Sequence, residues 1–304
     1  MSEHHHHHET PRNFGRAFAL GITLNLGFVL VEAFYGWRAG SLALLADAGH
    51  NLSDVVGLIL AWAGIAAARL PADDRHTYGW RRASIMAGFA NAVLLLLAMG
   101  SLAWEALQRL QQPAPLAGFT VMAVAGIGVV INTLTALMLM SGSRRDLNIR
   151  GAFLHMAADA LVSVGVVLAG ALYLWRGWAW IDPVMALAIA VVIVVGTWSL
   201  LRQTLHLLFD GVPAHIPLGA VRECLVQLPG VEAVHDLHVW AMASSETALT
   251  AHLVVGDGAG DSDALLQFAM ARLHGEFAIN HVTLQIESPR FSAACTSVPG
   301  GCAA

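Results

Sequence analysis

Long apolar segments fill the first two thirds of the chain. A helix needs about 20 predominantly apolar residues to cross the hydrocarbon layer of a membrane. Segments of that length run over residues 14–37, 42–68, 83–108, 118–141, 151–175 and 180–208. We therefore predict a six-helix transmembrane domain over residues 14–209, preceded by a polar arm of residues 1–13.

From Pro213 onward the pattern becomes that of a soluble α+β domain. An amphipathic stretch precedes two alternating segments, VEAVHDLHVWAM and TALTAHLVV, and a helical pattern near residues 263–274 precedes HVTLQIE. This order predicts an αββαβ domain over residues 210–290, ferredoxin-like in layout, and a flexible tail over residues 291–304. Strict alternation in the first strand would place His235 and His238 on opposite faces.

Composition and charge agree with a membrane protein. Hydrophobic residues make up 57% of the chain and charged residues only 12%, with a mean hydropathy of +0.62. These values differ strongly from those of an average soluble domain, so we expect a lipid bilayer as the environment. The net charge of −5 and the lack of a basic tract give no support for a nucleic-acid partner. Three cysteines without close pairing argue against a disulfide scaffold.

The distribution of arginine predicts the orientation. The richer side carries Arg12, Arg16, Arg69, Arg75, Arg81, Arg82, Arg144, Arg145 and Arg150. The opposite loops hold little more than Arg38, Arg109 and Arg176. Because cytoplasmic loops are enriched in Lys and Arg, both termini and the α+β domain are expected in the cytoplasm. The opening MSEHHHHHETPRN has no apolar core and is not expected to act as a signal peptide.

Two apolar segments carry the same ionisable motif, His-x-x-x-Asp. His50 and Asp54 lie in the second predicted span, and His155 and Asp159 repeat the spacing in the fifth. Residues four apart share one helical face, and ionisable groups inside a span are costly unless they are paired or line a wet cavity. Two imidazoles and two carboxylates form a four-coordinate ligand set suited to Zn²⁺, and imidazole also accommodates Co²⁺. We predict that these four residues bind a divalent transition metal.

Other polar residues occupy the predicted spans. Asn25 and Glu32 lie on one stripe of the first span, and Asp47 precedes His50 by three residues. Glu32 could assist the exit of protons or metal, or form a structural hydrogen bond to a neighbouring helix. Asp47 could shape the outer mouth of the metal site. We interpret Asn91, Asn132, Ser163 and Asp182 as packing or interface residues.

Four segments together carry a family resemblance over nearly the whole chain. They are SLALLADAGHNLSDV, ADDRHTYG, LNIRGAFLHMAADALVSVGV and VHDLHVWAMASSETALTAHLV. In this order they resemble the cation diffusion facilitator family, close to its bacterial zinc, cobalt and cadmium resistance exporters. The resemblance implies a homodimer in the inner membrane, six helices with a metallochaperone-like cytoplasmic domain, and metal/proton antiport. It also implies that His50, Asp54, His155 and Asp159 are the transport ligands.

The resemblance suggests two further metal sites. His235, His252 and Glu287 match family positions that bind a regulatory metal at the dimer contact, although Gln285 stands where some members have another His. Asp73 and His76 match a loop metal site, but Trp80 replaces the third His expected there. The alternatives are polar residues of the dimer interface and solvated loop charges.

The two terminal segments also contain metal-binding residue types. Cys295 and Cys302 could add thiolates to a metal site. His4–His8 are either an engineered tag or a native arm that gathers metal at low affinity.

Ligand chemistry suggests a transport mechanism. Metal binding requires neutral imidazoles and therefore releases protons. Alternating access of such a site would exchange Zn²⁺ for protons, so no organic cofactor is expected. We expect a transporter rather than an enzyme. The alternatives are a membrane metal sensor or scaffold, and a membrane zinc hydrolase, for which no His-Glu-x-x-His motif is present.

Overall fold

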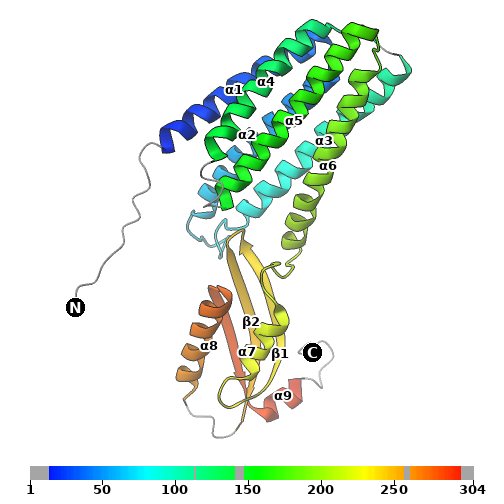
Figure 1. Ribbon diagram of the computed structural model, residues 1–304. Coiled ribbons are helices and arrows are strands. Elements are labelled where there is room, and N and C mark those ends of the chain that lie inside the picture. The colour runs from blue at the N-terminus through cyan, green and yellow to red at the C-terminus, as the bar shows by residue number, and fades with distance from the viewer. Residues whose placement is uncertain (1–13, 113, 141–146, 257–260, 296–304) are drawn as a thin grey trace, which may run out of the picture. The chain divides into compact units, whose positions relative to one another are not determined.

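Six long helices, α1 to α6, form the first part of the chain in the computed structural model (Figure 1). The structure describes residues 14–112, 114–140, 147–256 and 261–295, and within them the side chains from residue 26 onward except those of 147–149, 151–152 and 294–295. The helices are α1 (Phe14–Ala39), α2 (Leu42–Ala68), α3 (Ala83–Gln111), α4 (Gly118–Met140), α5 (Leu147–Arg176) and α6 (Ile181–Leu208). By length and composition, α2, α3, α4, α6 and the Phe153–Arg176 part of α5 can each cross a membrane. The remaining helix, α1, has 26 residues.

The described residues divide into two compact units. The first comprises residues up to Leu58 together with Asn91–Trp198, and the second comprises Ile59–Ala90 together with the residues from Ser199 onward. Small residues allow close helix contacts in the first unit: a Cβ atom added to Gly128 of α4 would lie 2.8 Å from the Phe28 ring of α1 and 3.2 Å from the Ser163 hydroxyl of α5. Close approach at such positions is typical of packing between membrane helices.

A buried acid at the start of α6 holds the start of α2. Gly40, with a φ of 68°, allows the tight turn that leads from α1 into α2. Asp182 then accepts hydrogen bonds from the Ser41 hydroxyl at 2.5 Å and from the Leu42 backbone N–H at 2.7 Å. The first backbone N–H groups of a helix have no partner within the helix, so this carboxylate caps α2 from another element.

The α+β part contains one three-stranded sheet and three helices. Its elements are α7 (Leu218–Val226), β1 (Val231–Ala243), β2 (Glu246–Val255), α8 (Ser262–Phe277), β3 (His281–Glu287) and α9 (Pro289–Cys295). The strand order is β1-β2-β3, with β1 antiparallel and β3 parallel to β2. Apolar side chains of α7 and α8 pack on one face of the sheet around Leu249 and Leu253. His252 and its strand partners His235 and Gln285 lie on the other face, because side chains alternate along a strand.

A bulge in β1 changes the expected alternation. His235 pairs with His252, and His238 pairs with Thr250, so three steps along β1 match two along β2. Asp236, in the left-handed region with a φ of 50°, lies within this irregularity. Opposed residues of paired strands lie on the same face, so His235 and His238 share a face. The expectation of opposite faces was therefore wrong, because alternation fails across an inserted residue.

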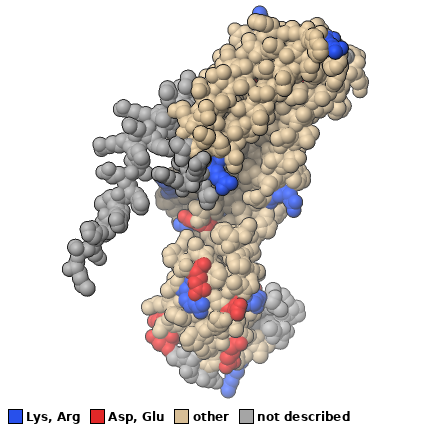
Figure 2. Space-filling model, viewed as in Figure 1, with Lys and Arg blue, Asp and Glu red and all other residues tan. Residues whose placement is uncertain are grey.

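The structure confirms the predicted fold class. The six helices lie within a few residues of the predicted spans, and the order α7-β1-β2-α8-β3 matches the predicted αββαβ pattern. The short helix α9 was not predicted and begins just before the segment expected to be a tail. Figure 2 shows that charged side chains are sparse on the visible face of the helical part and gather on the α+β part.

Candidate metal centres

Helices α2 and α5 bring the two His-x-x-x-Asp motifs together in the first unit. We call His50, Asp54, His155 and Asp159 the tetrad. Each motif occupies one face of its own helix because four residues make about one turn. The His50 and His155 rings meet edge to face, with 5.6 Å between their centroids. The pairing of the two faces results from the packing of the bundle.

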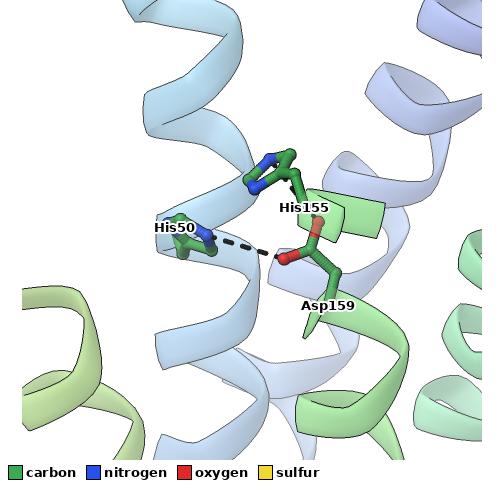
Figure 3. A group of neighbouring side chains, drawn as sticks. All are labelled: His50, His155 and Asp159. Carbon is green, nitrogen blue, oxygen red and sulfur yellow. Dashed lines mark ion pairs between the residues drawn. The ribbon is translucent and has the colours of Figure 1, made fainter. Parts of the chain in front are cut away.

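The Asp159 carboxylate lies between the two imidazoles (Figure 3). Its Oδ1 is 3.7 Å from His50 Nε2, and its Oδ2 is 3.6 Å from His155 Nε2. Asp54 Oδ2 lies 3.0 Å from His155 Nε2 and 3.8 Å from His50 Nε2. One ligand atom from each of His50, His155 and Asp159 lies within 4.8 Å of the others. His50, His155 and Asp159 can therefore contact one small ion, and Asp54 contacts both imidazoles beside them.

Exposure differs strongly across the tetrad. The side chain of Asp159 is only 3% exposed, whereas those of Asp54 and His155 are 38% and 42% exposed. The tetrad is therefore open on the side of Asp54 and His155 and closed on the side of Asp159. Two carboxylates also balance the charge of a divalent cation, which matters because an uncompensated buried charge is expensive.

Buried polar residues continue beyond Asp159. Glu32, Asp47, Asn51 and Ser163 are each at most 1% exposed, and the Ser163 hydroxyl donates a hydrogen bond to Asp47 Oδ2 at 3.0 Å. Ser163, interpreted from the sequence as a packing or interface residue, thus contacts a carboxylate. Asn25 belongs to α1, but its side chain lies outside the described residues.

A second group of ligand-type residues spans the sheet of the α+β part. We call His235, His252 and Glu287 the sheet cluster. Glu287 Oε2 lies 3.0 Å from His235 Nε2, and its Oε1 lies 2.9 Å from His252 Nδ1. The carboxylate is 1% exposed, and one ligand atom from each of the three residues lies within 4.8 Å of the others. The register produces this arrangement, because His252 pairs with His235 on one side and Gln285 on the other.

Two neighbours orient the sheet cluster. The Gln285 side-chain amide donates to Glu287 Oε1 at 2.8 Å, so this residue contacts a candidate ligand where some relatives are expected to have a His. Asp236 was not singled out from the sequence. Its carboxylate lies 3.5 Å from His252 Nε2 and 3.0 Å from His238 Nε2. Its position follows from the bulge, which strand periodicity does not predict.

The loop residues Asp73 and His76 contact each other. Asp73 Oδ1 accepts hydrogen bonds from the backbone N–H groups of His76, at 2.6 Å, and of Arg75, at 2.8 Å. These bonds, with the His76 side chain, hold the pKa of the Asp73 carboxyl below its ordinary value. Trp80 packs against the His76 ring, with 4.2 Å between the centroids. Hydrogen bonds within the loop are therefore sufficient to explain its conformation.

Several candidate residues near the chain ends lie outside the described part. They are His4–His8, Cys302 and the side chain of Cys295. Cys224 is a buried free thiol in α7, and burial raises its pKa above the ordinary value.

Comparison with known proteins gives matches over most of the chain. Residues 18–209 match the cation efflux transmembrane domain, and residues 213–289 match the cytoplasmic domain of cation efflux proteins. The metal cation efflux system protein CzcD of Cupriavidus metallidurans is 36% identical over 92% of this chain and 89% of its own length. The zinc transporter ZitB of Escherichia coli is 36% identical over 89% of this chain and 86% of its own length.

Two further similarities concern an antiporter and a solved domain. A cadmium, cobalt and zinc/H(+)-K(+) antiporter of Bacillus subtilis is 34% identical over 86% of this chain and 85% of its own length. The metal-bound C-terminal domain of CzcD is 37% identical, with a TM-score of 0.23, and covers 24% of this chain and 99% of that domain. The family consists of transporters and not of enzymes, which removes the hydrolase alternative. The chain is thus a multi-pass membrane protein that belongs to the cation diffusion facilitator family, in its zinc, cobalt and cadmium branch.

Proposed function

We propose that this protein exports a divalent transition metal, with Zn²⁺ as the preferred cargo, in exchange for protons, and that the tetrad holds the metal during transport. The observation that carries the proposal is the convergence of two imidazoles and two carboxylates between α2 and α5. Nitrogen and oxygen ligands in a four-coordinate set suit Zn²⁺, and Co²⁺ and Cd²⁺ are further candidates. The names of the relatives agree with this cargo.

The ligand types favour protons as the counter-ion. Imidazole has an ordinary pKa of about 6.5, so its charge can change within the physiological range. Metal binding requires neutral imidazoles, and each His that is protonated before binding must release its proton. A more acidic outer compartment would therefore favour metal release, and a more alkaline cytoplasm would favour loading. The antiporter name of the Bacillus subtilis relative supports this direction.

The proposal extends to location and assembly. Both termini and the α+β domain would lie in the cytoplasm of a bacterium, with the helices in the inner membrane, and the arginine-rich loops support this orientation. The functional unit is a homodimer, supported by the match to the cytoplasmic domain of cation efflux proteins. The sheet cluster would bind a regulatory zinc ion, with His235, His252 and Glu287 as ligands and Gln285 orienting the carboxylate.

Flux measurements in proteoliposomes test the proposal. Full-length protein is reconstituted with a zinc-sensitive dye inside the vesicles, and Zn²⁺ uptake is recorded with and without a pH gradient. We expect uptake to accelerate when the lumen is more acidic. Asp54→Asn and Asp159→Asn should each lower it by at least about tenfold, because even residues that merely orient metal ligands change affinity by about 10–100-fold.

The exposed Asp263→Asn is a matched control, since it makes the same chemical change on α8. Uptake that does not respond to the pH gradient would exclude proton coupling. Binding of Zn²⁺ by the wild-type protein without any uptake would favour a metal sensor or scaffold.

A further inference from the structure

Outside the tetrad, two acids among the described residues of the membrane bundle have buried carboxylate oxygens without hydrogen-bond partners. Glu32 of α1 is 0% exposed, and neither of its oxygens accepts a hydrogen bond from the part of the chain that the structure describes. Asp47 of α2 is 1% exposed, and its Oδ1 is likewise unpartnered among the described residues. Asp47 and Asn51 are the polar neighbours of the Glu32 carboxyl. We call Glu32 and Asp47 the acid pair.

An ordinary structural role does not explain the acid pair. A buried carboxylate that serves packing is normally saturated by donors, because each unmet group costs about 1–3 kcal/mol, and charged groups cost more. Among the described residues, the Ser163 hydroxyl is the only group that donates a hydrogen bond to the pair, at Asp47 Oδ2. The other charged or titratable groups that influence the pair are Asp159 and His50. Oxygens that converge without donors are suited to bind a cation.

The acid pair lies about one helical turn from the tetrad, beyond its buried end. Asp47 lies three residues before His50 on α2, and Ser163 lies four residues after Asp159 on α5. At about 1.5 Å per residue, both positions are roughly one turn, or about 5 Å, from the tetrad. Because the helices run in opposite directions, both shifts point the same way. They point away from Asp54 and His155, the exposed end of the tetrad.

We propose that Glu32 and Asp47 form a second cation subsite, through which the metal passes between the tetrad and the outer face. This inference rests on the proposed function, which places the acid pair on the outward side. The ligands would be two carboxylates, with the Ser163 hydroxyl and the Asn51 amide beside them, and the two carboxylates cancel the charge of a divalent ion. An all-oxygen set holds Zn²⁺ less well than a set containing imidazole. Metal would therefore leave the subsite more easily than the tetrad.

A thiolate placed in the subsite reports metal binding directly. Cys224, Cys295 and Cys302 are replaced by Ser, and Asp47→Cys is introduced into the full-length protein, which is then titrated with Cd²⁺. We expect the ultraviolet charge-transfer band of a Cd–thiolate bond, with a final amplitude that corresponds to one such bond per chain. Adding Glu32→Gln should weaken the Cd²⁺ affinity by at least about tenfold, the range expected for perturbed metal sites. Ala125→Cys, equally buried in α4, is the control and should give no band.

Two further sets of variants distinguish metal binding at the subsite from metal binding at the tetrad. The band should persist when Asp54→Asn and His155→Gln disable the tetrad, and its loss there would mean that the thiolate reports the tetrad instead. If Asp47→Cys does not fold, Ser163→Cys offers a second thiolate position with the same expected dependence on Glu32. A missing band, or one that is indifferent to Glu32→Gln, overturns the proposal.

Transport provides an independent measurement. Glu32→Gln should lower Zn²⁺ uptake by at least about tenfold, by the same reasoning, while equilibrium binding at the tetrad stays unchanged and Glu32→Asp restores part of the flux. Unchanged flux in Glu32→Gln would contradict the subsite while leaving the proposed function intact. A wild-type protein without flux would overturn the proposed function, yet the thiolate band would still decide whether the subsite binds metal.

Discussion

At the scale of single residues, position within an element decides what a side chain can do. Asp159 bridges two imidazoles because it lies on the α5 face turned toward α2 and is almost fully buried. Asp236 has a left-handed backbone at a bulge, a conformation that Asp tolerates better than most residues. The four-residue spacing within each motif predicted the tetrad in part, because it places His and Asp on one face of their helix. Nothing in the spacing predicted Asp236, because a bulge interrupts the strand period.

The loop carboxylate of Asp73 gives a prediction about pH. Its pKa is lowered by the backbone N–H groups of His76 and Arg75. A lowered folded-state pKa means that the ionised form supports the loop at every pH above the unfolded value of about 3.9. That support is lost only as the pH falls through the lower folded-state pKa. We expect carbon NMR of the Asp73 carboxyl, assigned with Asp73→Asn, to show a midpoint below about 3.9. A midpoint above that value would contradict the hydrogen-bonded loop.

At the scale of elements, α2 depends on a residue far away in the sequence. Its first turn is capped by Asp182, which was interpreted from the sequence as a packing or interface residue. The cap holds the helix that carries His50 and Asp54 and the acid Asp47. The sequence predicted the bounds of α2 because apolar length is a local property. It could not identify the cap, since Ser41 and Asp182 are 141 positions apart.

Removal of the cap should therefore destabilise the protein. Asp182→Ala leaves the Ser41 hydroxyl and the Leu42 N–H without their acceptor in a buried place, which costs about 1–3 kcal/mol for each group. We expect a lower midpoint of thermal unfolding and reduced Zn²⁺ uptake, with Asp182→Asn in between. Asp263→Asn, a change at an exposed acid on α8, serves as the control. An unchanged unfolding midpoint for Asp182→Ala would show that the cap contributes little to stability.

At the scale of the whole molecule, ligand-type residues gather in two separate places within the part of the chain that the structure describes. One is the tetrad in the helical unit, and the other is the sheet cluster in the α+β part. Each cluster combines residues from distant segments, so each forms only when its own part of the chain is folded. Metal bound to the folded state should then stabilise that part.

Zinc should raise the unfolding temperature of the α+β part through the sheet cluster. A ligand at about 100 times its Kd adds about 2.7 kcal/mol of stability. Glu287→Gln should reduce the zinc-induced shift in the unfolding temperature, measured by calorimetry of the full-length protein. The substitution replaces the charged carboxylate that contacts both His235 and His252 by a neutral amide. Asp263→Asn on the same part should retain the full shift. An equal shift in the two variants would mean that the sheet cluster does not bind the ion.

The sequence by itself determined the elements and the residue types of the centres. Apolar length set the six helices, period and turn signals set αββαβ, and the repeated His-x-x-x-Asp identified the tetrad, because all of these are local properties of the chain. Only the tertiary structure decided that α2 faces α5 at the tetrad, that His238 shares a face with His235, and that Asp182 caps α2. It also revealed the unpartnered oxygens of Glu32 and Asp47. These features depend on packing and register between distant segments, which no local pattern encodes.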